Sequence, residues 1–317
     1  MALTGLQIQK LLPKTNCKEC GSSTCMAFAM KLAAKKAEIS ECPYASEEAV
    51  RVLGAASEPP VRGVALGPDR SLVLGEETVL YRHEKTFFHR TALAVNVDDT
   101  AGPDEAGATL ASVRDYCLER VGQIIALDMV AVTHRGSDRA AFIDLARKAR
   151  EVTGLPLVVR SPDVEALEAV ASVLEGNRCV LCAATPQTLE RLRAAAQRYG
   201  HVLAVSAPDL DGLCGAAAAL REQGFQDILL QPPPGTLARQ FQVNSILRPA
   251  ALQDDAKPLG YPHLRFVEGG DAWDTVASAV TEIDKYGGVC VLPEFDAALL
   301  AVLMTLRLNV FTDPQKP

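Results

Sequence analysis

From residue 91 onward, short apolar runs alternate with stretches of helical spacing, and this alternation restricts the possible folds more than any other feature. Eight of the runs are rich in Val, Ile and Leu, which is typical of parallel strands buried on both faces. They cover residues 91–97, 126–134, 155–160, 179–185, 201–207, 227–232, 262–268 and 287–293. The helical stretches between them have similar start and stop signals. Residues 138–154, for example, begin with Asp and end with Gly. Repeated strand–helix units of this kind predict an α/β protein with a parallel sheet.

The number of units separates two α/β architectures. Eight strand–helix units in about 225 residues match a closed TIM (β/α)8 barrel. The alternative is an open doubly wound sheet, which would bind nucleotides at a glycine-rich turn after its first strand. The turn at residues 98–109 contains neither G-x-G-x-x-G nor a P-loop. We therefore predict a TIM barrel over residues 91–317, preceded by a small, mainly helical domain.

The first 57 residues form a separate compositional block, which Glu58-Pro59-Pro60 closes because two prolines cannot continue a helix. Residues 61–82 are expected to form two or three short strands around the turn at residues 67–70. The predicted domains are a cluster domain at 1–57, a linker with a β-ribbon at 58–90, and the barrel at 91–317. Within the first domain we expect a helix from Met26 to Ile39, with apolar strips on two opposite sides.

Four of the nine cysteines fall within a short segment with the spacing C-x2-C-x4-C-x16-C, directly followed by Pro43. They are Cys17, Cys20, Cys25 and Cys42. Three thiolates in a tight loop, completed by a fourth that a helix returns, can hold a [4Fe-4S] cluster. The small residues 21–24 let the backbone wrap closely and direct amide hydrogens at the sulfurs.

Other uses of these four cysteines remain open at this point. Zinc also accepts four thiolates, although zinc ribbons usually pair two C-x2-C knuckles and this segment contains one. Unliganded thiols are the third possibility. The spacing favours the iron–sulfur cluster, with the four cysteines as its metal ligands.

The charge balance excludes some classes of partner. The chain has 39 acidic against 32 basic residues and a net charge of −7, so it lacks the basic surface that nucleic acids or anionic membranes require. No apolar run approaches the roughly 20 residues that span a bilayer. The first residues do not resemble a secretion signal, and an odd number of cysteines is a poor disulfide framework. We expect a cytoplasmic protein.

Barrel active sites lie at the carboxyl ends of the strands, where this sequence places many polar residues. They are Asn96, Asp98, His134, Arg160, Thr185, Ser206, Gln231, Glu268 and Glu294. No nucleophile, base and orienting group can be assigned among them, so no catalytic residue is predicted. Asn96 and Asp98 could bind a pterin ring. Cys179 and Cys182, three apart in a strand, should point to opposite faces and serve as core residues, as should Cys214 and Cys290.

The segment TGLQIQKLLPKTNCKECGSSTC…ECPYAS at residues 4–46 resembles the large (gamma) subunits of the corrinoid iron–sulfur protein of the acetyl-CoA (Wood–Ljungdahl) pathway. The phrases LYRHEKTFFHRTALAVNV and LNVFTDPQKP extend the resemblance through the whole chain. It implies a [4Fe-4S] domain with Cys17, Cys20, Cys25 and Cys42 as ligands, followed by a TIM barrel. In that family a further C-terminal domain holds the corrinoid, whereas this chain stops at Pro317.

The resemblance implies a non-catalytic methyl-carrier subunit, which would move a methyl group from methyltetrahydrofolate, or a related pterin, toward acetyl-CoA synthase. Its cluster would reductively reactivate the corrinoid cobalt. The implied partners are the small (delta) TIM-barrel subunit, a methyltetrahydrofolate methyltransferase, acetyl-CoA synthase and a reductive activator. We do not expect residues 1–317 alone to hold cobalamin tightly, because none of the five histidines lies in a D-x-H-x-x-G motif.

Two alternatives to the carrier function stay open. The barrel could be a pterin-binding, corrinoid-dependent methyltransferase with a fused cluster. The chain could also be an electron-transfer module on an inert barrel.

Overall fold

The computed structural model describes residues 4–34, 36–57, 59–81, 83–84, 87–268 and 270–312. The chain divides into two compact units, Met1–Pro59 and Pro60–Pro317. Each unit is built around its own apolar cluster. The three domain limits expected from the sequence stay a prediction.

Short helices form the first unit. They are α1 (Gly5–Leu11), α2 (Cys25–Ala33), the 3-10 turn η1 (Ile39–Glu41) and α3 (Glu47–Ser57). Thr4 starts α1 through a capping box with Gln7, and Thr24 caps α2 by accepting the amide hydrogen of Ala27 at 3.0 Å. The apolar faces of these elements meet in one cluster. Its buried members are Ile8, Leu12, Cys25, Phe28, Ala29, Leu32, Ile39, Cys42 and Leu53.

The helix expected from Met26 to Ile39 is shorter than predicted, since α2 ends at Ala33. Nothing in the sequence stops it, because the following residues are good helix formers. Tertiary packing overrides that propensity. The chain leaves the helix and re-enters the core through Ile39, which joins Phe28 and Leu32 in the apolar cluster. This return places Cys42 directly after η1, in the same cluster.

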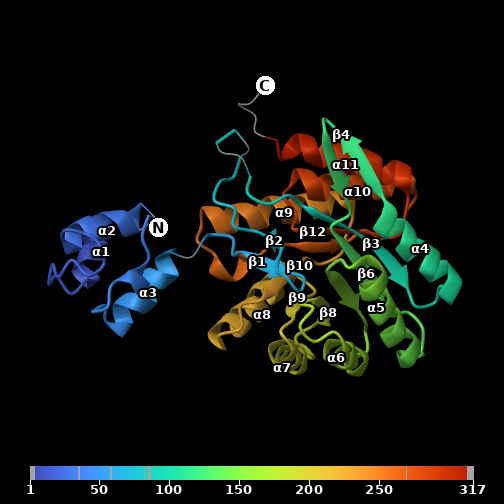
Figure 1. Cartoon of the computed structure of the whole chain (residues 1–317), viewed down its shortest axis with the longest axis horizontal. Helices are drawn as coiled ribbons and strands as arrows, with labels where there is room; N and C mark the ends of the chain where they lie inside the picture. Colours follow the sequence, from blue (N-terminus) through green and yellow to red (C-terminus); the bar gives the residue numbers. More distant parts are fainter. Residues whose placement is uncertain are drawn as a thin grey trace. The chain divides into compact units, whose positions relative to one another are not determined.

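The second unit is a barrel of eight parallel strands surrounded by helices (Figure 1). The strands are β3 (Ala92–Asp98), β6 (Met129–Thr133), β7 (Leu157–Arg160), β8 (Val180–Ala184), β9 (Val202–Ser206), β10 (Ile228–Gln231), β11 (Leu264–Phe266) and β12 (Val289–Leu292). Their order is β10-β9-β8-β7-β6-β3-β12-β11. All eight strands expected from the sequence are present, and the barrel prediction is confirmed.

Helices follow the strands and lie around their outside (Figure 1). They are α4 (Pro103–Asp115), α5 (Arg139–Thr153), α6 (Val164–Val173), α7 (Leu189–Tyr199), α8 (Leu210–Glu222), α9 (Leu237–Leu252), α10 (Ala272–Asp284) and α11 (Ala297–Val310), with the 3-10 turn η2 (Lys257–Leu259). Aspartates cap several of them, and Gly154 and Gly200 end α5 and α7 in the left-handed conformation.

Strand residues alternate between two apolar layers. In β3, Leu93 and Val95 belong to the layer between strands and helices, whereas Ala92 and Ala94 belong to the barrel interior. The buried residues Val64, Leu66 and Leu74 of a two-stranded ribbon complete the interior layer. This ribbon consists of β1 (Val64–Leu66) and β2 (Leu72–Leu74), as the sequence predicts. Arg178, just before β8, donates to the carbonyl of Ala65 at 2.6 Å, so the ribbon covers the amino ends of the strands.

The barrel is closed by a short contact between two of its strands. Each pair of neighbouring strands in this order shares at least three register positions. The remaining pair, β10 and β11, is joined by the single bridge between Leu230 and His263. The Leu230 amide donates to the Pro262 carbonyl there at 2.9 Å. We call this junction the seam.

A second hairpin between α4 and β6 was not expected. It pairs β4 (Cys117–Arg120) with β5 (Gln123–Ala126). Its two-residue turn places Val121 and Gly122 at φ values of 50° and 70°, a geometry that usually recruits Asn-Gly or Asp-Gly. Because Val-Gly is not that signal, sequence patterns gave no indication of the turn.

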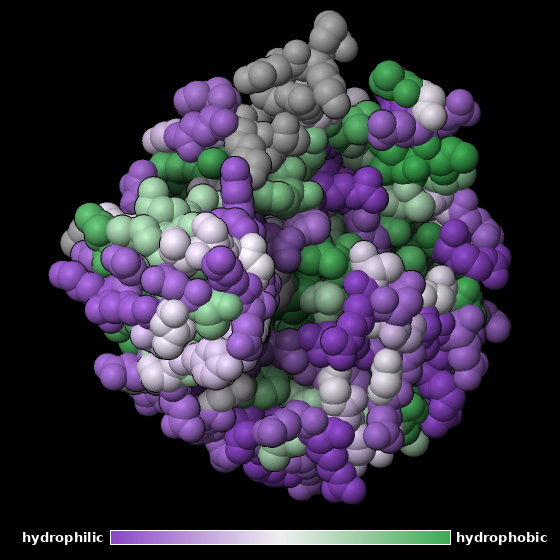
Figure 2. Space-filling model, turned by 60° about the vertical axis from the view of Figure 1, so that its left-hand side comes forward, coloured by the Kyte–Doolittle hydropathy of each residue, from purple (hydrophilic) through white to green (hydrophobic). Residues whose placement is uncertain are grey.

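One face of the molecule carries mixed polarity (Figure 2). On the face that Figure 2 shows, hydrophilic residues predominate and hydrophobic residues form small groups among them. Within the described ranges, none of the helices combines the length and apolar character needed to cross a membrane.

Candidate functional site

The four cysteines of the first unit lie at different depths. Cys25 and Cys42 are buried, each 8% exposed, and both belong to the apolar cluster of this unit. Cys20 is half-buried and packs against the same cluster, whereas Cys17 is exposed. All four are free thiols. The structure thus brings the end of the cysteine loop and the returning Cys42 to one apolar core, with Cys17 at its solvent side.

The loop that carries the first cysteines has an unusual backbone. Lys14, Asn16 and Lys18 have positive φ values of 59°, 50° and 69°, which residues with side chains rarely adopt. Gly21, with φ of 69°, follows directly after Cys20. Strained backbone of this kind concentrates at functional sites, and left-handed residues contribute to the amide-lined concavities that bind anions, iron–sulfur clusters included.

Side chains hold this loop against its surroundings. The Asn16 Oδ1 accepts the amide hydrogen of Cys25 at 2.8 Å, which fixes the start of the loop to the first residue of α2. The Tyr44 hydroxyl donates to the Glu19 carboxylate at 3.0 Å and ties the segment after Cys42 to the loop. This hydrogen bond and the negative charge of Glu19 raise the pKa of Tyr44. Both contacts connect segments that carry cysteines.

The donor set fits an iron–sulfur cluster. Three of the four free thiols, those of Cys20, Cys25 and Cys42, lie at one apolar core, and Cys17 is exposed. The loop that carries the first cysteines contains several left-handed residues. In a cubane each thiolate binds a different iron, so the sulfurs need not surround one ion. Among the described residues, no three His, Cys, Asp or Glu side chains are grouped as ligands of a single ion.

The carboxyl ends of the barrel strands surround a second candidate region. A cavity of about 610 Å³ is lined there by several of the expected polar residues. They are His134, Arg160, Thr185, Ser206, Gln231 and Glu268. A neighbouring cavity of about 280 Å³ is lined by Asn96 and Asp98, together with Arg160 and Glu268. Glu294 lines neither cavity.

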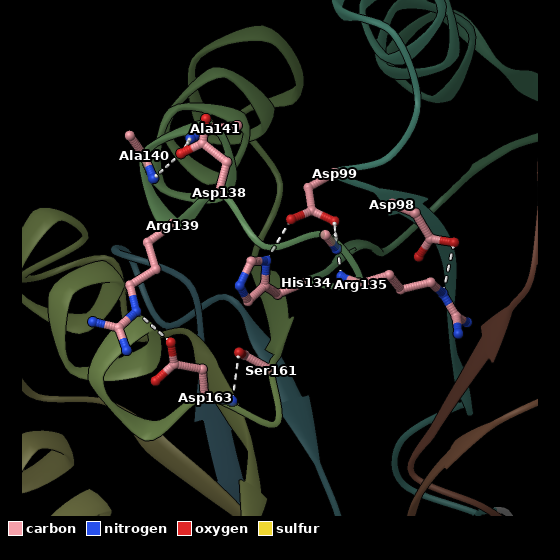
Figure 3. A network of polar contacts seen from close by, with 11 residues as sticks. Asp98, Asp99, His134, Arg135, Asp138, Arg139, Ala140, Ala141, Ser161 and Asp163 are labelled. Atoms are coloured by element: carbon pink, nitrogen blue, oxygen red, sulfur yellow. Dashed lines mark hydrogen bonds and ion pairs between the residues drawn. The ribbon is translucent and has the colours of Figure 1, made fainter.

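Asn96 and Asp98 are engaged with their neighbours. The Asn96 amide donates to Asp98 Oδ1 at 2.7 Å, and its oxygen accepts from the Thr133 hydroxyl at 2.6 Å. Arg135 donates to the other Asp98 oxygen at 2.8 Å (Figure 3). Since both Asp98 oxygens already accept hydrogen bonds, this geometry favours a network that fixes the strand ends over a pterin-binding pair.

Asp99 was missed in the sequence and is the centre of this network (Figure 3). Its side chain is buried, 2% exposed, and bonds to His134 Nδ1. Its other oxygen accepts the amide hydrogens of Arg135 and Gly136 at 2.8 and 2.9 Å. Burial alone would raise the pKa of Asp99, but these amides and His134 lower it. The consecutive pair Asp98-Asp99 directly after a strand was the available sequence signal.

The cysteines of the barrel play a structural part. Cys179 and Cys182 are buried in the outer and inner apolar layers respectively, so they do point to opposite faces. Burial raises the pKa of each to about 12. Cys290 is buried as expected, whereas Cys214 is only half-buried on α8, a partial correction.

Known protein families match both units. Residues 12–44 match the family model described as a putative Fe-S cluster. Residues 63–317 match the family model described as the CO dehydrogenase/acetyl-CoA synthase delta subunit.

Whole-chain relatives decide the family. The corrinoid/iron-sulfur protein large subunit of Moorella thermoacetica is 34% identical, over 100% of this chain and 71% of the relative. This chain belongs to the family of corrinoid/iron-sulfur protein large subunits. The chain is also similar to the acetyl-CoA decarbonylase/synthase complex subunit gamma of Methanothermobacter thermautotrophicus, with 29% identity over 100% of this chain and 72% of the relative. The resemblance stated from the sequence is therefore confirmed.

A solved structure supports the barrel. Dihydropteroate synthase from Thermus thermophilus, crystallised in complex with 6HMPPP, superimposes with a TM-score of 0.51. The match covers 78% of this chain and 98% of that enzyme at 16% identity, which is a likeness of fold.

Proposed function

We propose that this chain is the iron–sulfur and scaffold part of a corrinoid methyl carrier, which moves a methyl group from methyltetrahydrofolate, or a related pterin, toward acetyl-CoA synthase. The observation that carries the proposal is the convergence of Cys20, Cys25 and Cys42 on one apolar core in a family of corrinoid/iron-sulfur proteins. Cys17, Cys20, Cys25 and Cys42 are the proposed ligands of a [4Fe-4S] cluster.

The chain's own residues have defined tasks in this proposal. The four thiolates bind the cluster, and Asn16 holds the loop in place through the Cys25 amide. Phe28, Leu32 and Ile39 exclude water from the inner side of the site. When bound, such a cluster supplies single electrons at low potential, the chemistry needed to return oxidised corrinoid cobalt to its methyl-accepting state.

The proposed partners follow from the same family. They are the small TIM-barrel subunit, a methyltetrahydrofolate methyltransferase, acetyl-CoA synthase and a reductive activator. The names of the relatives as large and gamma subunits support a multi-subunit assembly. The polar network at the strand ends supports a scaffold role for the barrel, because Asp98 and Asp99 are already bonded within the protein.

Metal analysis tests the proposed cluster. The chain purified without oxygen should contain about four irons and four sulfides per molecule. Cys42→Ala should lose the intact cluster while the circular dichroism of the barrel persists, because each unit has its own apolar cluster. Cys117→Ala, an exposed thiol outside the loop, is the matched control and should keep the cluster. Stoichiometric zinc without sulfide in the wild-type chain would refute the proposal.

Residues 1–317 alone should not retain cobalamin. None of the five histidines has the D-x-H-x-x-G surroundings that commonly ligate cobalt, and His201 and His263 are buried within the barrel. Equilibrium dialysis with cobalamin should therefore show no stoichiometric binding at micromolar concentration. Tight binding by this chain without a partner would show that the corrinoid site lies within it.

A further inference from the structure

Three consecutive hydroxyl residues, Ser22, Ser23 and Thr24, lie between Cys20 and Cys25, and the structure gives them different surroundings. Thr24 caps α2 by accepting the amide hydrogen of Ala27. Ser23 is exposed to solvent. Ser22 is only 4% exposed, and its Oγ is buried without a hydrogen-bond partner among the described residues. Of these three residues, Ser22 is thus the one whose hydroxyl is shielded from solvent and has no hydrogen-bond partner among the described residues.

A buried hydroxyl normally forms a hydrogen bond, because removing it from water without a new partner is unfavourable. Two of the nearby backbone donors are already in use. The Gly21 amide donates to the Lys18 carbonyl at 3.0 Å, and the Cys25 amide donates to Asn16. The Ser22 O–H is a buried side-chain donor without a partner among the described residues, two residues after one proposed ligand and three before the next.

We propose that the Ser22 hydroxyl donates a hydrogen bond to a sulfur of the iron–sulfur cluster and thereby raises its reduction potential. This inference rests on the proposed cluster. The sulfurs carry more negative charge after the cluster accepts an electron, so a donor stabilises the reduced form more than the oxidised form. Ser22 is a positioning and tuning residue, since it does not bind iron.

Variants at Ser22 and Ser23 of the full chain, prepared without oxygen, test the inference. Ser22→Ala removes the hydroxyl, and Ser23→Ala makes the same chemical change at the exposed neighbour. Ser22→Thr and Ser22→Val form a second pair of variants. Their side chains have nearly the same shape, but only the Thr side chain has a hydroxyl. Iron and sulfide are measured in each. The midpoint potential is then obtained by dye-mediated reduction, followed through the electron paramagnetic resonance signal of the reduced cluster.

We expect Ser22→Ala to keep its iron and sulfide and to shift to a more negative midpoint potential. Ser23→Ala should match the wild type, and the Thr variant should have a higher potential than the Val variant. Equal potentials in wild type and Ser22→Ala, or an equal shift in Ser23→Ala, would overturn the inference. If Ser22→Ala does not retain the cluster, the Thr and Val pair decides, and equal potentials in that pair overturn it.

Failure of the proposed function gives a different result. A wild-type chain without iron and sulfide would refute the cluster itself and this inference with it. An intact cluster whose potential does not depend on the Ser22 hydroxyl would refute the inference alone.

Discussion

Glu282 on α10 is a completely buried carboxylate in the second unit. One of its oxygens forms an ion pair with Arg265 on β11. The same oxygen accepts from Gln240 at 2.7 Å and from Asn244 at 3.0 Å, both on α9. These contacts join two helices and a strand next to the seam. A buried charge of this kind depends on its partners, because removing one leaves the other without compensation.

Glu282→Leu should therefore lower the free energy of unfolding by about 3–5 kcal/mol, since Arg265 would remain buried and unpaired. Urea unfolding followed by circular dichroism measures the change. The control is Glu168→Leu, which breaks the exposed pair with Arg191 and should cost less than about 1 kcal/mol. Similar costs for the two variants would contradict the assigned role of the buried pair.

The sequence identified some candidate site residues and missed others. The spacing of Cys17, Cys20, Cys25 and Cys42 identified the candidate cluster ligands, because ligand spacing is local information. The difference between Ser22 and Ser23 was not visible, since it depends on which side of the loop packs against the core. Asp99 escaped attention for a similar reason: its partners His134 and Arg135 come from a different strand end.

At the scale of elements, the β4–β5 hairpin shows how sharply burial can change between neighbours. Ile124 is 79% exposed, whereas Ile125 is 3% exposed and belongs to the outer apolar layer. The alternation follows from the strand period of two residues. Ile125 anchors the hairpin to the barrel, and Ile124 faces solvent.

Ile125→Ala should cost about 2–5 kcal/mol of unfolding free energy, because it removes buried methyl groups and leaves a cavity. Ile124→Ala makes the same chemical change at an exposed position and should remain within about 0.5 kcal/mol of the wild type. Urea unfolding of both variants is the measurement. An equally small effect at Ile125 would mean that the hairpin does not anchor to the barrel.

The ends of elements were harder to predict than their existence. All eight barrel strands were found because buried parallel strands are continuous apolar runs. The end of α2 was misplaced by several residues, since no Gly or Pro marks the point where packing turns the chain. The β4–β5 hairpin was missed because its Val-Gly turn and exposed residues carry neither a turn signal nor a buried pattern.

At the scale of the whole molecule, barrel stability should depend on pH through His263 at the seam. Its imidazole is buried, and its Nδ1 has no partner among the described residues. Burial, with the positive charges of Arg265 and Arg248, lowers its pKa from 6.5 to about 3. Between pH 6.5 and about pH 3 the unfolded chain therefore binds a proton that the folded barrel does not accept, and stability falls as the pH falls through this range.

Protonation of His263 in the unfolded chain should lower the free energy of unfolding by roughly 1.5 kcal/mol between pH 6.5 and pH 5. In His263→Gln the decline should be smaller by about that amount. His83→Gln makes the same chemical change at an exposed histidine and is measured alongside. Unfolding by urea at a series of pH values provides the comparison. Identical pH profiles for wild type and His263→Gln would rule out this contribution.

The architecture of the barrel was predictable because eight similar units leave few arrangements. The single-bridge contact at which it closes was not, because the sequence cannot show how many residues pair across β10 and β11. The candidate site divides in the same way: the cysteine motif was visible in the chain, whereas the cavities at the strand ends depend on the assembled barrel.

The seam gives the barrel a preferred place for transient opening. Breaking the single bridge between Leu230 and His263 exposes one edge of β10 and one edge of β11, while the other strand pairs keep their ladders. Local fluctuations of this kind need less free energy than global unfolding. Such an opening would expose the backbone at Leu230 and His263 while the rest of the barrel stays intact.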